Sequence, residues 1–251
     1  MPRLEQKTAV ITGASNGIGK GIALLFAREG AQVIINYHRS TDEARQLVED
    51  IKTAGGNATA VQADISDGQQ LDQLIKAAQK TLGTIDIWVN NAGADILTGP
   101  GAALTDDEKF QRLIDVDLKG TMQCCWAIAP IMQTQGQGVI INMSWDLALH
   151  GFSGHNPQLF ATVKAGILGF SRAFAKSYGP KIRINVLAPG WIETAFAKEV
   201  MNSAYYKARL QEIPVGRFGT PEDVAEAAVF LASDESSYMT GEMIKINGGL
   251  S

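Results

Sequence analysis

The sequence predicts an α/β protein built on a doubly wound parallel sheet. Short apolar runs rich in β-branched residues alternate with segments of helical periodicity along the whole chain, and parallel strands require such crossover connections. Two runs, Val33-Ile34-Ile35 and Ile140-Ile141, are apolar at every position, which is typical of strands covered on both faces. In sheets of this class, ligands bind at the carboxyl ends of the strands.

The expected strands are the apolar runs Ala9–Thr12, Gln32–Asn36, Ala58–Ala63, Ile85–Asn90, Gly138–Met143, Ile182–Leu187 and Met243–Ile246. Helices are expected between them. One spans Asp106–Gln133, and another begins near Asn156, where the next residue, Pro157, suits a first helical turn. Because no repeat, low-complexity run or linker divides the chain, we expect a single domain over residues 1–251.

The bulk composition limits the classes of partner. The chain has 251 residues, 45% of them hydrophobic and 19% charged, with a net charge of -4. This balance gives no reason to expect nucleic acid or a membrane as partner, and a small molecule is expected instead. Cys124 and Cys125 are adjacent and cannot form a disulfide framework, and no metal is expected. Without a signal-peptide pattern or a bilayer-spanning apolar stretch, we expect a cytoplasmic location.

A glycine-rich stretch, Thr12–Gly19, joins the first expected strand to a helical pattern. The order of strand, tight turn and helix lets the backbone approach a pyrophosphate at a helix N-terminus. A plain strand-to-helix turn is the alternative for such a loop taken alone. The expected cofactor-binding residues of this loop are Gly13, Ser15, Asn16, Gly17, Ile18 and Gly19.

Two further motifs follow later strands. Asn90-Asn91-Ala92-Gly93 ends the fourth, and Pro189-Gly190-Trp191-Ile192-Glu193-Thr194 follows the sixth. Together with the TGxxxGxG spacing of the first loop and the C-terminal segment 238–249, these motifs resemble the short-chain dehydrogenase/reductase family, and within it the 3-oxoacyl-carrier-protein reductases. The resemblance covers nearly the whole chain. It implies one Rossmann-type domain with a seven-stranded parallel sheet, an NAD(P)-dependent oxidoreductase, and a homotetramer or homodimer.

The resemblance also implies where the cofactor is held. Asp64 would contact the adenine, and the Ile192 backbone and the Thr194 hydroxyl would hold the nicotinamide amide. Asp64 is otherwise a helix N-cap, a role that Ser66 or Asp67 could fill instead. The remaining contacts implied are Ile65, Asn91, Ala92, Gly93, Lys164, Pro189 and Gly190.

The residues after the second strand bear on the choice of cofactor. His38 and Arg39 stand where dinucleotide folds place an acidic residue for the ribose or a basic one for a 2'-phosphate. Because no carboxylate is present there, we expect NADP(H), with NAD(H) as the second candidate. The alternative is that Arg39 is only a solvent-exposed charge in a loop and binds no phosphate.

The resemblance fails at the catalytic positions. The family places a Tyr and a Lys four residues apart on one helix, whereas this chain has Phe160 and Lys164. Phenylalanine cannot supply the proton that carbonyl reduction requires, and a positioned acid contributes a rate factor of about 10² to 10⁴. Trp145 follows Ser144 where family members commonly have a second Ser, and Asp117 replaces an Asn. The alignment of Ser144 with the catalytic Ser is left open.

Lys164 lies on an apolar helical stripe and therefore needs a partner or a polar cavity. An ion pair with Asp117 and a contact with the nicotinamide ribose are both open, and they are compatible. A replacement proton donor is expected among Asp146, His150, His155, Tyr205 and Tyr206, each of which could instead be an exposed loop side chain. The catalytic candidates are Lys164, Ser144, Asp117, Asp146 and the Phe160 position.

A segment around residues 193–212 resembles the family's substrate lid. Its neighbourhood supplies His155, Trp191, Phe196, Tyr205 and Tyr206 as candidate pocket residues, with simple packing as the alternative for the aromatic rings. We expect hydride transfer between NAD(P)(H) and a carbonyl or alcohol substrate with a non-standard proton donor. The alternatives are reduction of a conjugated C=C bond, and a cofactor-binding sensor or scaffold that does not turn over. No residue selects the substrate.

Overall fold

The computed structural model describes residues 2–194 and 204–251, except for the side chain of Tyr205. Its seven-stranded sheet has the order β3-β2-β1-β4-β5-β6-β7, and every adjacent pair is parallel. The strands are β1 (Thr8–Ile11), β2 (Gln32–Tyr37), β3 (Asn57–Gln62), β4 (Ile87–Asn90), β5 (Gly138–Met143), β6 (Ile182–Pro189) and β7 (Met243–Ile246). The predicted fold class is confirmed.

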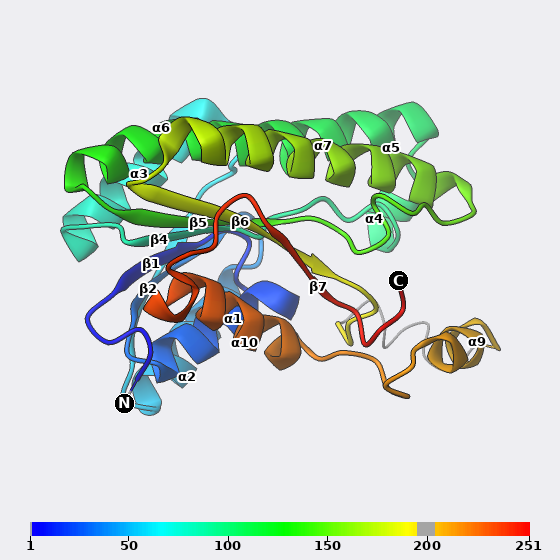
Figure 1. Ribbon diagram of the computed structural model, residues 1–251, viewed down its shortest axis with the longest axis horizontal. Helices are drawn as coiled ribbons and strands as arrows, with labels where there is room; N and C mark the ends of the chain where they lie inside the picture. Colours follow the sequence, from blue (N-terminus) through cyan, green and yellow to red (C-terminus); the bar gives the residue numbers. More distant parts are fainter. Residues whose placement is uncertain (1, 195–203) are drawn as a thin grey trace.

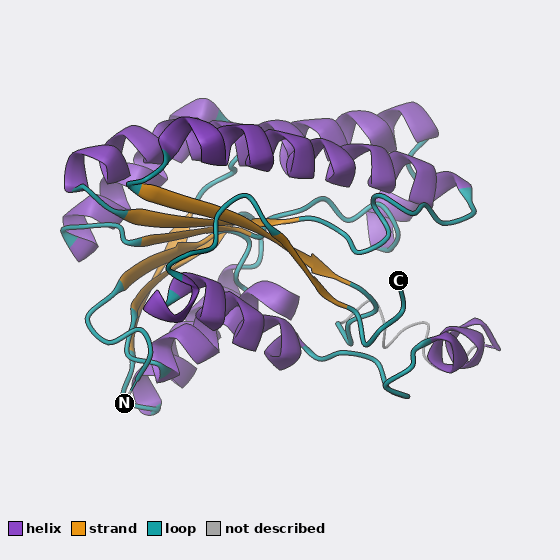
Figure 2. Ribbon diagram, in the orientation of Figure 1, coloured by secondary structure: helices purple, strands orange, loops and turns teal. Residues whose placement is uncertain are grey.

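Helices cover both faces of the sheet (Figure 1). One layer contains α1 (Gly17–Arg28), α2 (Thr41–Thr53) and α10 (Pro221–Ala232), and the other contains α3 (Gly68–Leu82), α6 (Thr121–Gln135) and α7 (His155–Tyr178). The shorter elements are α4 (Gly99–Ala102), α5 (Asp106–Leu113), η1 (Ile114–Gly120), α9 (Ala204–Glu212) and the 3-10 turn η2 (Asp234–Ser236). Figure 2 shows α9 apart from both layers, on the side where β6 and β7 end.

The continuous apolar runs of the central strands divide their side chains between the two layers. Ile11, Ile35 and Ile141 belong to the cluster that includes α1, α2 and α10. Their neighbours along the strands, Val10 and Ile34, belong to the cluster that includes α3 and α6. All of these side chains are fully buried. A run without polar positions is therefore what a two-sided core requires.

Most expected boundaries differ from the observed ones by one or two residues, but one long helix is not regular. The predicted helix Asp106–Gln133 begins at Asp106, continues through a π-helical segment, Ile114–Gly120, and ends at Gln135. A π-helical turn contains a residue more than an α-helical turn and is frequent at functional sites. Among the described residues, no helix is long and apolar enough to cross a bilayer.

Candidate active site

The glycine turn after β1 forms a backbone cradle. Gly13 and Gly17 have φ values of +59° and +54°, in the left-handed region that favours glycine. A Cβ on Gly13 would lie 2.8 Å from the Cα of Ala92, so the turn touches the end of β4. Asn16 precedes α1 without a side-chain capping bond, which leaves first-turn N–H groups available to an anion. The remaining loop residues named above, Ser15, Ile18 and Gly19, lie in this turn and in the first turn of α1.

Asn36, at the end of β2, supports the glycine turn. Its Oδ1 accepts a hydrogen bond from the Gly13 N–H at 3.2 Å, and its backbone carbonyl accepts one from the Ala14 N–H at 2.8 Å. Sequence reasoning missed this residue, although a polar residue that ends a run of buried apolar ones is a usable signal.

Beyond β2 and β3, charged side chains gather at the same edge of the sheet. His38 and Arg39 are exposed, and His38 Nδ1 lies 3.7 Å from Asp64 Oδ2. Burial would raise the pKa of Asp64, but hydrogen bonds from Ser66 outweigh it and lower that pKa. Asp67, not Asp64, caps α3. Asp64 therefore stays an ionised hydrogen-bond acceptor at this edge of the sheet, next to the buried Ile65.

The end of β4 is tied to the glycine turn by Thr12 and Asn91. The Thr12 hydroxyl oxygen accepts hydrogen bonds from the Asn91 and Ala92 N–H groups, both at 3.0 Å. Asn91 Nδ2 donates to the Gly13 carbonyl at 3.0 Å. The next residue, Gly93, lies so near Asp117 that a Cβ there would be 3.1 Å from its Oδ2. One run of contacts therefore leads from the glycine turn to Asp117.

The segment after β6 connects β7 with the glycine turn. The Gly190 N–H donates to the Ile246 carbonyl at 2.9 Å, which holds the residues after Pro189 against β7. The Thr194 N–H donates to the Ile192 carbonyl at 2.8 Å. A Cβ on Gly17 would lie 3.7 Å from Thr194 Cγ2, so this segment reaches the glycine turn.

Lys164 lies at the centre of the site. Its Nζ is 2.9 Å from Asp117 Oδ2, with only 8% of the lysine side chain and 1% of the aspartate side chain exposed. The other carboxylate oxygen, Oδ1, accepts the Ala94 N–H at 2.7 Å. Lys164 Nζ also lies 5.2 Å from the centre of the Phe160 ring, which stands one helical turn away. Phe160 in turn packs edge-on against Trp145, with ring centres 5.5 Å apart.

The ion pair is thus one of the two arrangements expected for Lys164. The carboxylate comes from the π-helical segment η1, and the ammonium comes from α7. Both charges are buried, so each depends on the other for compensation.

The two other catalytic candidates, Ser144 and Asp146, make contacts away from this ion pair. The buried Ser144 hydroxyl donates to the Lys164 carbonyl at 2.8 Å. Asp146 is fully buried, and its Oδ2 accepts a hydrogen bond from Asn247 Nδ2 at 3.1 Å. Its Oδ1 has no hydrogen-bond partner among the described residues. Burial raises the pKa of Asp146, against the opposing effect of the Asn247 hydrogen bond.

Aromatic rings form a separate cluster between the segment after β6 and α9. Trp191 and Tyr206 both contact Phe218, with ring centres 6.4 Å and 4.3 Å apart, and Trp191 also lies 6.3 Å from Phe152. Arg209 stands 5.3 Å from the centre of the Phe152 ring. Phe152 and Phe218 were missed in the sequence because nothing in a loop's composition tells which distant ring it meets.

The histidines make contacts of their own at the surface. His155 Nε2 lies 2.9 Å from Asp106 Oδ2, and His150 Nε2 lies 3.0 Å from Lys245 Nζ. The structure thus does not bring either one to Lys164. Phe196 and the side chain of Tyr205 lie outside the described residues.

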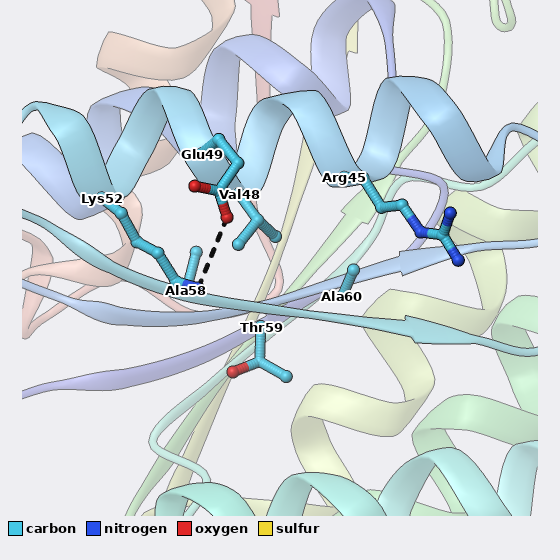
Figure 3. A pocket seen from close by; sticks show the side chains of 7 residues that line it. All are labelled: Arg45, Val48, Glu49, Lys52, Ala58, Thr59 and Ala60. Carbon is cyan, nitrogen blue, oxygen red and sulfur yellow. Dashed lines mark ion pairs between the residues drawn. The ribbon is translucent and has the colours of Figure 1, made fainter.

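A surface hollow lies between α2 and β3 (Figure 3). It is lined by Arg45, Val48, Glu49, Lys52, Ala58, Thr59 and Ala60. Glu49 and Lys52 pair across 3.6 Å, and both are largely exposed. Because the hollow lies beside β3 rather than at the carboxyl ends of the strands, it does not belong to the candidate site.

Comparison with known proteins finds the same organisation elsewhere. A family described as Enoyl-(Acyl carrier protein) reductase matches residues 13–251. The 3-oxoacyl-[acyl-carrier-protein] reductase FabG of Thermotoga maritima is 39% identical over 249 residues, which cover 99% of each chain.

Two solved structures are similar over nearly their whole length. A 7 alpha-hydroxysteroid dehydrogenase complexed with NADH and 7-oxo glycochenodeoxycholic acid is 35% identical, with a TM-score of 0.88, covering 98% of this chain and 95% of that one. A short chain dehydrogenase from Burkholderia cenocepacia in complex with NADP is 30% identical, with a TM-score of 0.87 and 99% of each chain covered. Sequence and fold agree over nearly the whole chain, and the chain belongs to the short-chain dehydrogenase/reductase family of NAD(P)-dependent oxidoreductases.

Proposed function

We propose that this protein transfers hydride between NADP(H) and a carbonyl or alcohol substrate, and that it does so without a phenol as proton donor. The observation that carries this proposal is the buried Lys164–Asp117 pair beside the Phe160 ring, linked through Gly93 and Ala92 to the glycine turn. A charged group held in place next to a cofactor cradle is suited to a reaction in which charge develops on a substrate oxygen.

The choice of a carbonyl substrate rests on the individual relatives. The family description names an enoyl reductase. The relatives of high identity are named for an oxoacyl substrate or crystallised with an oxo-steroid. Carbonyl chemistry is therefore proposed over reduction of a C=C bond. Trp191 and Tyr206, with the lid around residues 193–212 of the single domain, are proposed to line the substrate pocket.

NADP(H) is the proposed cofactor because Arg39 is exposed at the end of β2 and no carboxylate lies within Asn36–Ser40. The solved relatives agree with this choice, since two of them hold NADP and one holds NADH. Gly13, Gly17 and the first turn of α1 would hold the pyrophosphate.

Replacing Arg39 by Ala tests the cofactor. A lost contact between a guanidinium and a phosphate is worth about 1.5–3 kcal/mol, so NADPH should bind about 10- to 100-fold more weakly while NADH binding changes little. Arg45→Ala is the matched control, because Arg45 lines the hollow of Figure 3 instead. Titrations followed by nicotinamide fluorescence give both affinities. Equal losses for NADPH and NADH would contradict the assignment of Arg39.

Turnover is tested with NADPH and two carbonyl probes, acetoacetyl-coenzyme A and 7-oxo glycochenodeoxycholic acid, together with an enoyl thioester as the comparison. NADPH consumption with either carbonyl probe supports the proposal. Consumption with the enoyl probe alone, or tight NADPH binding with no consumption in a broad carbonyl panel, would contradict it.

A homotetramer or homodimer is proposed from the outer face of α6 and α7. Trp126 is 51% exposed and packs edge-on against Phe170 at 5.9 Å, and Phe170 continues into a stack with Phe174. An exposed tryptophan beside partly buried and buried rings is a place where a second subunit could bury apolar surface. Light scattering of the wild type and of Trp126→Lys would measure the oligomeric state.

The two free, buried cysteines fit the proposed cytoplasmic location.

A further inference from the structure

The contacts of the candidate proton donors show which of them has a proton close to Phe160. The Ser144 hydroxyl is buried and donates to a backbone carbonyl, and Asp146 is fully buried against Asn247. His150 and His155 are paired with surface groups, and Tyr206 stacks against Phe218. Lys164 alone among these candidates has its acidic protons next to the Phe160 ring.

The ammonium group of Lys164 is only partly engaged. Its Nζ faces Asp117 Oδ2 at 2.9 Å and the Met143 carbonyl at 3.5 Å. An ammonium carries three N–H groups, and the described residues offer Lys164 no third acceptor. In addition, 8% of the side chain remains exposed. One N–H is therefore left for an oxygen that enters the site.

Acidity does not favour a phenol over an ammonium. In model peptides a tyrosine and a lysine release their protons at similar pH, about 10 and about 10.4. An alkoxide formed by hydride addition is far more basic than either conjugate base. By these ordinary values, a lysine is about as able as a phenol to donate a proton to an alkoxide.

We propose that the Lys164 ammonium, oriented by Asp117, donates the proton to the substrate oxygen. This inference rests on the proposed carbonyl reduction. A reduced nicotinamide, when bound, supplies the hydride, that is, one proton with two electrons, to the carbonyl carbon. The π pair of the carbonyl moves to oxygen, an N–H bond of Lys164 breaks as the O–H bond forms, and neutral Lys164 regains a proton from water. Alcohol oxidation is the reverse, with the neutral amine as base.

Asp117 is a positioning residue in this scheme. The Ala94 N–H fixes one carboxylate oxygen and Lys164 holds the other, so the carboxylate cannot turn away.

The decisive variant is Lys164→Arg, which keeps the positive charge but cannot release a proton in the working pH range. The readouts are kcat/KM for acetoacetyl-coenzyme A and NADPH affinity. The proposal expects a loss of at least about 100-fold in kcat/KM at saturating NADPH. Adding Phe160→Tyr to Lys164→Arg returns a donor and should restore part of the rate. Lys119→Arg, on exposed Lys119 of η1, is the matched control and should leave the rate unchanged.

The outcomes separate the two proposals. If the wild type reduces the carbonyl and Lys164→Arg keeps a rate within about 10-fold, Lys164 is not the donor and the proposed function stands. If Asp146→Asn loses most of the rate while Lys164→Arg remains active, Lys164 is again not the proton donor, and the proposed function stands. If the wild type reduces no carbonyl, the proposed function fails first.

If Lys164→Arg does not fold, the pH dependence of the wild-type rate tests the proposal instead. The group facing Lys164 is Asp117, which is already paired with it. A rate that falls only in the alkaline range where lysines ordinarily titrate supports the proposal. A rate that falls between about pH 5 and 8 overturns it, because a carboxylic acid or a histidine is then the donor.

Discussion

Removing the Asp117 carboxylate should destabilise the protein far more than removing an exposed one. In Asp117→Ala the Lys164 ammonium stays buried without its counter-charge, and the Ala94 N–H loses its acceptor. With 1% and 8% of the two side chains exposed, the penalty of a broken buried pair applies with little screening, about 3–5 kcal/mol.

This cost is large enough to measure by thermal unfolding. For a chain of this size, each kcal/mol lowers Tm by about 2–4 °C, so Asp117→Ala should unfold roughly 6–20 °C below the wild type. Circular dichroism at 222 nm follows the loss of helix. Urea unfolding at 25 °C gives the free energy independently.

A matched pair on the same segment provides the control. Asp115 and Lys119 of η1 lie 4.0 Å apart with 41% and 55% of their side chains exposed. Asp115→Ala should cost less than about 1 kcal/mol, because exposed ion pairs contribute little.

A double-mutant cycle isolates the interaction. Asp117→Ala combined with Lys164→Met removes both charges, so the double variant should be less destabilised than the sum of the single variants. If Asp117→Ala lowers Tm no more than Asp115→Ala, or if the two effects simply add, the pair is not desolvated and the reasoning is wrong.

Two further predictions concern the glycine turn and the buried carboxyl. Gly13→Ala should weaken NADPH binding and lower Tm, because φ is +59° and the new Cβ would lie 2.8 Å from the Ala92 Cα. Gly55→Ala, with a φ of +85° but open space around it, is the control in a NADPH titration, and equal losses of affinity would refute the cradle. The pKa of Asp146 is raised by burial, so the native state keeps a proton that the unfolded chain releases above about pH 3.9. Stability should therefore fall as pH rises from there through the folded pKa. Asp146→Asn cannot ionise, so its Tm relative to the wild type should be higher at pH 7 than at pH 4, and an unchanged difference would contradict the shift.

The strands were predictable because burial on both faces leaves a direct trace in the residues. Val33-Ile34-Ile35 is apolar at every position, and the structure buries all three side chains completely. The glycine turn was predictable for a similar reason, since Gly13 and Gly17 occupy backbone conformations that other residues adopt rarely.

The ion pair was predictable only as one of two arrangements. A lysine on the apolar stripe of α7 needs a counter-charge, but the chain alone does not fix which carboxylate comes near it. The π-helical segment had no visible signal, because Ile114–Gly120 has helical periodicity and no proline. Contacts of Asp117 with Lys164 and Ala94, remote in sequence, accompany that local geometry.

The direction of side chains after β5 could not be predicted. Ser144 donates to the Lys164 carbonyl and Asp146 turns to Asn247, and both contacts depend on how the chain bends after Met143. The aromatic cluster around Phe218 joins residues from four separate segments, and composition does not encode such pairings.

The wide turn of η1 makes the site sensitive to the length of the chain. A regular α-helix rotates about 100° per residue, since it has 3.6 residues per turn. Deleting one residue within Ile114–Gly120 would let α5 and α6 join as an ordinary helix, and the carboxylate at 117 would swing by about that angle away from Lys164. The presence of one additional residue in this stretch thus determines whether Lys164 has a counter-charge, even though no residue proposed to hold the cofactor would change.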